Sequence, residues 1–313
     1  MKRILLFVFT SGALLLTSCQ PVRPKENIAT ETPYVVASTL TSTPVSVLVP
    51  TSTPITIACD PSTTDFCLMD WQATFKNPLG LDSPLTIARS YSYGSTENGK
   101  RDPHRGVDLE SKEGEPVYAP AVGTVIFAGR DHDRVYTPWD DYYGNLIVLQ
   151  HEDGLFTLYG HLSQINVSVG TQVNIGDVMG AVGHTGVAIG SHLHFEVRIG
   201  GNGTDFYSTE NPELWLPLVE GMGGIAFKID AGNAPKLQRQ LVLYRYVPGK
   251  NKIAKKYYFS SYPKSFEHNN EDWAINGLPP GRYRIAFGDS GNLYERIVNV
   301  EVGKLTQVVV KLK

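Results

Sequence analysis

In the stretch Ser191-His-Leu-His-Phe-Glu196, polar and apolar side chains alternate from His192 onward. An alternation with a period of two residues is typical of a β-strand that has one face in a core. Since residues two apart on a strand point to the same side, His192 and His194 share one face, while Leu193 and Phe195 pack behind them. We therefore expect a strand that presents two imidazole rings to one cleft.

Short runs of β-forming residues flank this strand, and Gly-containing turns separate them. Between residues 59 and 220, no segment has the spacing of a long amphipathic helix. The strands expected there are 115–119, 123–128, 145–150, 155–159, 172–174 and 193–199. This pattern predicts a mostly β domain.

The region after residue 222 has the same character. The strands expected there are 225–229, 241–247, 283–287, 296–302 and 306–311, with the turn Pro279-Pro-Gly281 between them. Several short strands at such spacing predict a small β-sandwich. We expect residues 59–220 and 222–313 to form two domains, which suits a chain of 313 residues.

The composition favours strands and argues against a nucleic-acid partner. The chain contains 30 Gly, 20 Pro and 16 Tyr residues, a mixture that favours strands and tight turns over long helices. Its formal net charge is -3, and Lys and Arg are scattered along it. Proteins that bind DNA or RNA usually carry a clustered basic surface. We therefore expect no nucleic-acid partner.

The first residues have the pattern of an export signal. Lys2 and Arg3 precede an apolar run at 4–16 that is too short to span a bilayer comfortably. The run ends in Leu16-Thr-Ser-Cys19, which resembles the bacterial lipobox, in which the Cys becomes the lipidated first residue after cleavage. We expect residues 1–18 to be a lipoprotein signal peptide, and a lipid on Cys19 to anchor the chain to a membrane outside the cytoplasm. The alternative is an ordinary signal peptide with a chance Cys near its end.

Residues 19–58 are rich in Ser, Thr and Pro and contain little that could form a packed face. We expect a disordered linker, which would span roughly 30 Å as a coil or roughly 120 Å as a polyproline II helix. Cys59 and Cys67 follow it, close enough in sequence to close a small loop in an oxidising compartment. A disulfide between them is the prediction, and two free thiols are the alternative.

Three further side chains could complete a metal site with the two histidines of the 191–196 stretch. His104 and Asp108 are four residues apart, a spacing that leaves both on one side, and a neutral His with a carboxylate suits zinc. His161 stands in Tyr159-Gly-His161. Each pair alone is weak evidence, because a His-x-His pair on a strand is by default an ordinary surface pair. The combination of all five residues predicts a metal-dependent site.

The same combination carries a resemblance to a known family. Residues 102–200 resemble the lysostaphin-type, or LytM-type, zinc endopeptidases of family M23. The motifs that carry the resemblance are His104-Arg-Gly-Val-Asp108, Pro116-Val-Tyr-Ala-Pro-Ala-Val-Gly-Thr-Val125, Tyr143-Gly-Asn-Leu-Ile147, Tyr159-Gly-His161, Gly176-Asp-Val-Met-Gly180 and His192-Leu-His-Phe-Glu196. The resemblance implies that residues 59–220 form an antiparallel β-sheet peptidase domain that cuts peptide cross-links of bacterial peptidoglycan.

This resemblance also implies a role for each of the five residues. His104, Asp108 and His194 would bind zinc (Zn2+), and the remaining zinc position would hold water. His161 and His192 would be the catalytic histidines that do not bind the metal.

Weaker patterns suggest what surrounds the site. The stretch 277–283 resembles carboxypeptidase-regulatory or prealbumin-like β-sandwiches. We expect substrate contacts from the Gly-rich loop 183–190 and from the segment around Trp139 and Tyr142. Tyr91 or Tyr93 could supply the hydroxyl that assists the oxyanion in this family. The other histidines are expected to be solvated residues without a role: His132, His151, His184 and His268.

Two other interpretations remain. The stretches 116–125 and 170–177 also resemble biotinyl and lipoyl carrier domains, but these need an exposed Lys at a hairpin tip, and residues 142–145 contain none. The second alternative is a catalytically inactive LytM-type protein that binds and activates cell-wall amidases. Such proteins typically lack metal ligands, whereas all five positions are filled here.

Overall fold

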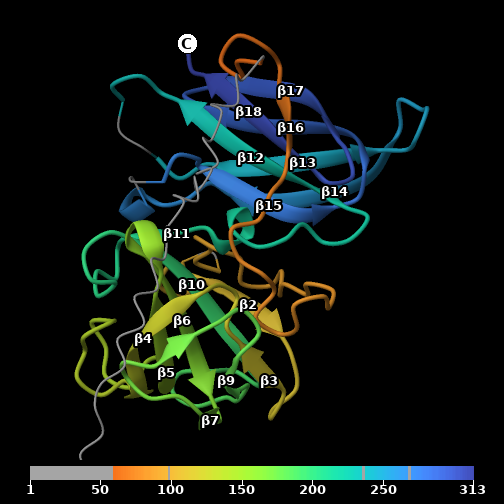
Figure 1. Ribbon diagram of the computed structural model, residues 1–313. Coiled ribbons are helices and arrows are strands. Elements are labelled where there is room, and N and C mark those ends of the chain that lie inside the picture. Colours follow the sequence, from red (N-terminus) through yellow and green to blue (C-terminus); the bar gives the residue numbers. More distant parts are fainter. Residues whose placement is uncertain (1–58, 98, 235–236, 267–268) are drawn as a thin grey trace, which may run out of the picture. The chain divides into compact units, whose positions relative to one another are not determined.

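The computed structural model describes residues 59–97, 99–234, 237–266 and 269–313, and almost all of its regular structure is β-strand (Figure 1). The predicted signal peptide, Cys19 and the predicted linker lie outside the described residues. The helical elements of the described part are three short 3-10 turns: η1 (Glu152–Gly154), η2 (Pro212–Leu214) and η3 (Lys264–Phe266). The prediction of a mostly β protein is confirmed. Within the described ranges, no helix has the length and apolar character needed to cross a membrane.

The largest sheet contains seven strands and lies within the residues predicted to form the peptidase domain. Its strands in spatial order are β11 (Thr209–Glu210), β10 (His192–Ile199), β6 (Leu155–Leu162), β5 (Asn145–Gln150), β4 (Gly123–Arg130) and β8 (Gln172–Val173), with β2 (Val107–Glu110) also paired to β10. All of these pairings are antiparallel, as predicted. A smaller antiparallel sheet consists of β3 (Pro116–Tyr118), β9 (Val178–Ala181) and β7 (Gln164–Ile165).

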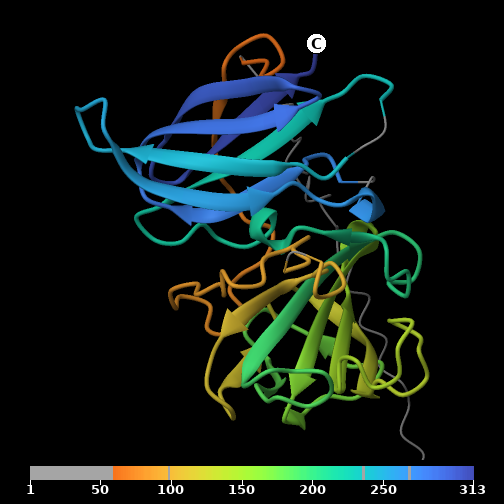
Figure 2. The same cartoon turned by 180° about the vertical axis from the view of Figure 1, so that it is seen from behind.

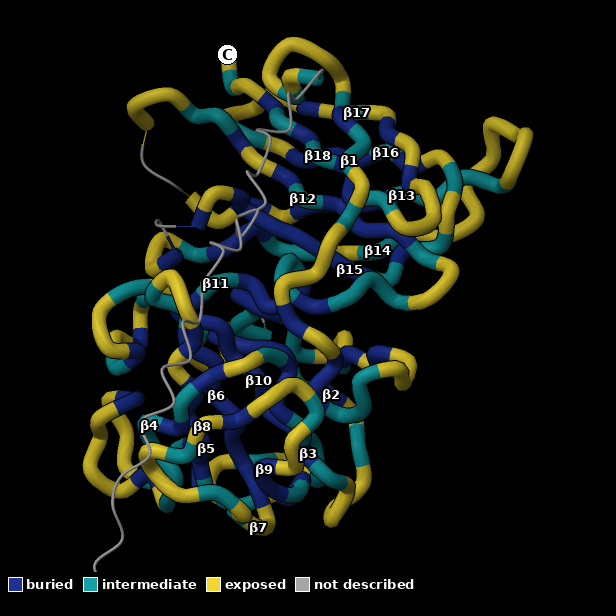
Figure 3. Tube along the Cα trace, viewed as in Figure 1, coloured by how far each residue is buried: buried dark blue, intermediate teal, exposed yellow. Residues whose placement is uncertain are grey.

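One hydrophobic core joins these two sheets. Val117 from β3 and the side chains of Leu193 and Phe195 from β10 are all fully buried in it. Figure 3 shows this buried region in dark blue along β5, β6 and β10. Burial of a side chain of this size stabilises the fold by about 1.5–3 kcal/mol relative to exposure. Because Leu193 and Phe195 occupy the core side of β10, His192 and His194 lie on its other face.

The C-terminal region forms two four-stranded sheets (Figures 1 and 2). The first contains, in order, β1 (Cys67–Asp70), β18 (Lys304–Lys311), β12 (Gly223–Asp230) and β15 (Trp273–Leu278). The second contains β14 (Ile253–Ser260), β13 (Gln240–Tyr246), β16 (Gly281–Asp289) and β17 (Asn292–Val300). Buried side chains from both sheets, such as Phe227 and Val308 from the first and Leu243 and Ile285 from the second, share one core. The region is therefore a β-sandwich.

The first strand of the described residues, β1, belongs to this sandwich and not to the seven-stranded sheet. β1 pairs antiparallel with β18, with Cys67 opposite Gln307, while β18 pairs in parallel with β12. The predicted domain boundary at residue 59 therefore does not coincide with a boundary between the sheets. A disulfide joins Cys59 to Cys67, the first residue of β1, which confirms the predicted pairing.

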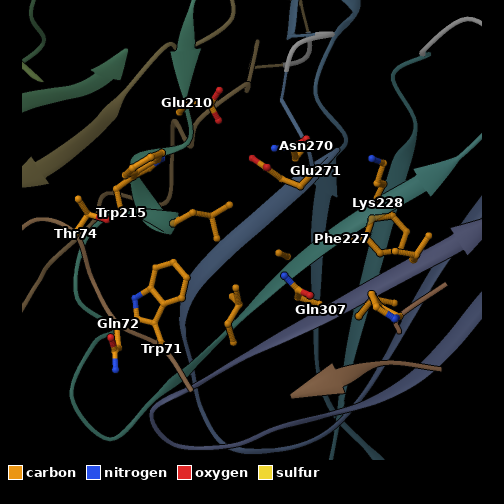
Figure 4. Close-up of a pocket in the computed structure, with 16 residues that line it drawn as sticks. Trp71, Gln72, Thr74, Glu210, Trp215, Phe227, Lys228, Asn270, Glu271 and Gln307 are labelled. Atoms are coloured by element: carbon orange, nitrogen blue, oxygen red, sulfur yellow. The ribbon is translucent and has the colours of Figure 1, made fainter. Parts of the chain in front are cut away.

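All described residues belong to one compact unit, so the sandwich packs directly on the residues of the peptidase-like region. At the junction between these two regions, the indole N–H of Trp71 donates a hydrogen bond to the carbonyl of Leu216 (3.1 Å). A pocket of about 450 Å³ opens beside it (Figure 4). The lining includes Trp71 and Trp215 on one side and Phe227 and Lys228 on the other.

Candidate metal centre and catalytic cleft

The side chains of His104, Asp108 and His194 converge on one point. Nε2 of His104 lies 3.2 Å from Oδ1 of Asp108, Nδ1 of His194 lies 3.0 Å from the same oxygen, and the two ring nitrogens lie 3.2 Å apart. Ligand atoms about 2.0–2.1 Å from a tetrahedral zinc ion lie about 3.3 Å from one another. The three donor atoms therefore fit three corners of a zinc tetrahedron. Among the described residues, His104, Asp108 and His194 form a group that could hold a metal ion.

Strand pairing explains why these residues meet. β2 lies antiparallel to β10 with Asp108 directly opposite His194, so the two side chains are cross-strand neighbours. His104 reaches the same point from the turn that precedes β2. Gly106 makes that approach possible, because a Cβ on this residue would lie 2.5 Å from the carbonyl oxygen of Phe195 and 2.9 Å from the His194 ring. Any larger residue at Gly106 would push the turn away from β10.

Hydrogen bonds on the far side of each ring fix its orientation. Nδ1 of His104 lies 2.6 Å from the carbonyl oxygen of Tyr91. Since a carbonyl oxygen only accepts, Nδ1 carries the proton and Nε2 is left with a lone pair for a metal. In the same way, Nε2 of His194 donates to Oε1 of Glu196 (3.0 Å), which leaves Nδ1 free to bind. Such acceptors behind ligating histidines orient the rings and raise their basicity.

The electrostatics of this point favour a positive charge. Burial alone would lower the pKa of His194, but its hydrogen bonds with Asp108 and Glu196 raise it to about 9. Burial likewise opposes ionisation of Asp108, yet the neighbouring His104 and His194 hold the pKa of its carboxyl well below the usual range. Two carboxylates therefore stabilise a proton on His194, and a cation of higher charge could take that proton's place. The donor set of two imidazoles and one carboxylate suits zinc.

A buried ion pair supports His194 from behind. Glu196 and Arg198 are both 0% exposed, and Nε of Arg198 donates to Oε2 of Glu196 (2.9 Å). The hydroxyl of Tyr143 donates to Oε1 of Glu196 (2.6 Å) and accepts from Arg198 (2.9 Å). Burial would raise the pKa of Glu196, but Arg198 and the hydrogen bonds from His194 and Tyr143 lower it to about 2. Glu196 is therefore an anion that accepts a hydrogen bond from Nε2–H of His194.

Our sequence interpretation assigned no role to Glu196, Arg198 or Tyr143. Glu196 and Arg198 follow His194 at intervals of two residues along β10 and so share its face. The period of two could therefore have identified them. Nothing in the local sequence indicates that the Tyr143 hydroxyl reaches the same carboxylate.

His161 and His192 lie beside the triangle with their rings close together. The ring centroids are 4.9 Å apart, and the His161 ring is 5.6 Å from that of His194. Nδ1 of His161 donates to the carbonyl of Thr185 (2.8 Å), and Nδ1 of His192 donates to that of Gly190 (3.0 Å). The Nε2 atom of each ring therefore carries the lone pair.

Both rings are held in the neutral form. Burial, assisted by the His194 and His192 rings, lowers the pKa of His161 to about 3, and burial also lowers the pKa of His192. His161 has a φ of +62°, in the left-handed region that non-glycine residues rarely adopt. Such strain concentrates at functional sites, where the surrounding structure enforces it.

All five residues line one cleft of about 530 Å³. Its other walls include Tyr91, whose ring stacks on that of His104 (4.2 Å between centroids), and Tyr142. Val187 and Ile189, from the predicted contact loop, also line it and are 67% and 81% exposed. The structure thus brings together every residue predicted to bind metal or to act in catalysis.

The two tyrosines suggested for the oxyanion differ in position. Tyr91 lines the cleft, and its hydroxyl donates to the carbonyl of Asp102. Tyr93 is only 4% exposed, and its hydroxyl donates to the carbonyl of Thr209 (2.5 Å). Tyr93 is therefore buried away from the cleft, whereas Tyr91 and Tyr142 line it.

The prediction that His151 is a solvated residue is wrong. His151 is buried, Nδ1 lies 2.8 Å from the carbonyl oxygen of Val122, and Nε2 lies 2.7 Å from the hydroxyl of Thr157. The side chains of His132 and His184 are more than half exposed, as predicted. His268 lies outside the described residues.

Comparison with known proteins identifies the class to which this region belongs. Residues 102–206 match the model of Peptidase family M23, so this part of the chain is an M23 family domain. The matched range includes all five site residues.

Curated relatives match the same region. DD-carboxypeptidase/endopeptidase Mpg of Neisseria meningitidis is 41% identical over 98 residues, which cover 31% of this chain and 20% of Mpg. Peptidoglycan DD-endopeptidase ShyA of Vibrio cholerae is 38% identical over 99 residues, or 32% of this chain and 21% of ShyA. Cell division protein DipM of Caulobacter vibrioides is 36% identical over 126 residues, or 40% of this chain and 19% of DipM. The match thus spans about one fifth of these relatives.

Solved structures match it as well. The catalytic domain of lysostaphin from Staphylococcus simulans is 32% identical, with 41% of this chain and 89% of that chain covered and a TM-score of 0.34. A zinc-containing peptidase from Vibrio cholerae is 30% identical, with 41% and 37% covered and a TM-score of 0.34.

Proposed function

We propose that the chain is a zinc-dependent endopeptidase that hydrolyses peptide cross-links of bacterial peptidoglycan. The observation that carries this proposal is the triangle of donor atoms on His104, Asp108 and His194, beside two neutral histidines in the same cleft. The M23 family domain and the peptidoglycan DD-endopeptidase activity in the name of its relative ShyA support it.

His104, Asp108 and His194 would hold the ion. When bound, zinc supplies Lewis acidity that activates water and polarises a substrate carbonyl. The carbonyl of Tyr91 and the carboxylate of Glu196 keep the two imidazole rings in the tautomers that leave a lone pair for it. Asp108 contributes the negative charge that makes the site selective for a cation.

His161 and His192 would move protons and charge during hydrolysis. Each ring donates Nδ1–H to a carbonyl, so its neutral Nε2 can accept a proton from the attacking water. The protonated ring can then hydrogen-bond the developing oxyanion or return a proton to the leaving amine. The ring spacing of 4.9 Å allows the two to act on the same peptide group.

The cleft walls would bind the peptide. Val187 and Ile189 are exposed apolar side chains on the loop that precedes β10, and Tyr142 belongs to the same lining. A short peptide laid in this cleft would cover those apolar surfaces, which favours binding. The cross-link peptide is therefore the part of the wall that we expect these residues to contact.

The test combines metal content with digestion of purified cell wall. We expect about one zinc ion per wild-type chain and release of muropeptides, identified by mass spectrometry. EDTA should abolish release and added zinc should restore it. His104→Ala should neither hold zinc nor cut, because it removes one corner of the triangle. A wild-type protein without metal and without cutting activity would refute the proposal.

The alternative is a catalytically inactive LytM-type protein that activates cell-wall amidases. The complete set of five site residues favours an enzyme over this role. Wall digestion by a separate amidase, measured with and without the chain, distinguishes the two. Stimulation of the amidase by both wild type and His104→Ala, without muropeptide release by the chain alone, would support the alternative.

We also propose that the protein acts outside the cytoplasm, attached through a lipid on Cys19 and a linker at residues 19–58. The disulfide between Cys59 and Cys67 supports an oxidising compartment.

Cys19→Ala should lose fatty-acid labelling in growing cells and move from the membrane fraction to the soluble fraction, because the lipid is the only membrane anchor in this proposal. The matched control is the double variant Cys59→Ala, Cys67→Ala, which should keep the label. Unlabelled wild-type protein would contradict the anchor.

A further inference from the structure

The segment from Tyr91 to His104 has one side in the catalytic cleft and holds His104 in place. The Tyr91 ring stacks on the His104 ring, and the Tyr91 carbonyl accepts a hydrogen bond from Nδ1–H of His104. The N–H of Gly94 donates to the carbonyl of His104 (2.7 Å), and the N–H of His104 donates to the carbonyl of Ser95 (3.0 Å). A shift of residues 91–95 would therefore move the His104 ring.

The other side of this segment rests on the C-terminal region. Tyr93 is buried and meets two rings edge-on: Tyr262 at 5.1 Å and Phe266 at 5.0 Å between centroids. Both rings belong to the connection between β14 and β15. Gly94 has a φ of +73°, and a Cβ there would lie 2.6 Å from the Tyr262 ring. The backbone beside Tyr93 thus lies directly against a side chain of the C-terminal region.

Arg105, the residue after His104, also packs against the C-terminal region. Its guanidinium carbon lies 4.6–4.7 Å from the ring centroids of Phe206, Tyr207 and Phe266. Arg105 is 5% exposed, and its Nε and Nη1 atoms have no hydrogen-bond partner among the described residues. Burying a charged group in this way is costly unless its surroundings stabilise the charge. The faces of three rings can do so, and one of them comes from η3.

A polar contact ties Arg89, two residues before the segment, to β15. Nη1 of Arg89 donates to both carboxylate oxygens of Glu213 (2.8 and 2.7 Å), and its Nη2 donates to the carbonyl of Asn276 (2.5 Å). Oε2 of Glu213 also accepts from the N–H of Asn276 (2.6 Å). Hydrogen bonds between a guanidinium and a carboxylate are stronger than those between neutral groups, because both partners are charged. Arg89 and Arg105, which flank the segment, therefore both contact the C-terminal region.

We propose that the C-terminal β-sandwich and its β14–β15 connection are a positioning element of the metal centre. Tyr262 and Phe266 support the segment that orients His104, so that zinc affinity depends on side chains outside the M23 family domain. This inference rests on the proposed function, because it concerns the zinc site proposed there. Loss of groups that orient a ligating His typically weakens metal binding about 10- to 100-fold.

The first test measures zinc affinity in Phe266→Ala, in the full chain, by competition with a chromophoric chelator. We expect the zinc dissociation constant to rise about 10-fold. Phe266→Leu, which keeps apolar bulk against Tyr93, should restore most of the affinity. The matched control is Phe287→Ala, which truncates an equally buried ring of the sandwich core that packs on Phe227 and Tyr294. It should lower the melting temperature of the metal-free protein but leave zinc affinity unchanged.

A second pair of variants tests the contact from the side of the segment. Gly94→Ala puts a methyl group against the Tyr262 ring and should also raise the zinc dissociation constant about 10-fold. Gly99→Ala is its control, because Gly99 has a similar φ of +81° but nothing within 4 Å of the added Cβ. Trp71→Ala, beside the pocket of Figure 4, controls for the junction as a whole and should bind zinc as wild type does.

The outcomes separate this inference from the function on which it rests. Zinc affinity in Phe266→Ala and Gly94→Ala equal to that in their controls, with a wild type that binds zinc, would overturn the inference and leave the proposed function intact. A wild type that binds no zinc would overturn both. Weakened binding confined to Phe266→Ala and Gly94→Ala would support the positioning role.

Discussion

Replacing His161 or His192 by Ala should lower the rate of cross-link hydrolysis by about 100-fold or more while the protein keeps its zinc. Neither ring contributes an atom to the donor triangle of His104, Asp108 and His194. Both present a neutral Nε2 to the cleft, because Nδ1 donates to a backbone carbonyl. Initial rates of muropeptide release and zinc content per chain measure the two effects separately.

His132→Ala is the matched control for this experiment, since the His132 side chain is more than half exposed and its nearest carboxylate partner is the equally exposed Asp140. It should cut at the wild-type rate. A wild-type rate in His161→Ala or His192→Ala would show that the replaced ring transfers no essential proton. Loss of zinc from either variant would instead assign that ring to the metal.

The sequence predicts those parts of the site that depend on local geometry, that is, on one strand or one turn. The alternation along β10 places Leu193 and Phe195 in the core and His194 on the opposite face, and the structure confirms this. The spacing of His104 and Asp108 is equally informative, because the short turn between them lets both reach His194. Period and spacing are sufficient here since one strand and one turn determine the result.

The groups that orient the site are harder to predict. The acceptor for His104 is a backbone carbonyl, that of Tyr91, and any residue type could supply it. The left-handed conformation of His161 could not be predicted either, because histidine rarely adopts it. These features depend on how loops pack and not on residue identity, so a pattern of side chains does not reveal them.

Long-range pairing explains the remaining differences in the fold. β1 belongs to the sandwich because it pairs with β18, with Cys67 opposite Gln307. These two strands are far apart in the sequence, so no local pattern predicts their pairing. β14 includes Lys255 and Lys256, which are exposed on a strand at the edge of its sheet. Charged residues are common on edge strands, where they hinder pairing with other chains, and they weaken the hydrophobic pattern that would identify the strand.

Arg198→Met should lower the free energy of unfolding by about 3–5 kcal/mol, because it leaves the carboxylate of Glu196 buried without its cation. The substitution keeps most of the side-chain volume, so packing loss contributes little. Arg198 also donates to the carbonyls of Gly203 and Tyr136 and to the Tyr143 hydroxyl, all of which lose a donor. Urea unfolding of the metal-free protein measures the change.

The matched control is Arg284→Met, which removes the cation from the partly exposed Arg284–Glu295 pair on β16 and β17. Because water screens that pair, the change in stability should stay within about 1 kcal/mol. Equal losses in the two variants would mean that burial does not set the strength of the Glu196–Arg198 pair. A large loss confined to Arg198→Met would show that Arg198 stabilises the buried Glu196 carboxylate. The same carboxylate accepts the hydrogen bond from Nε2–H of His194, so the pair also supports the orientation of that ring.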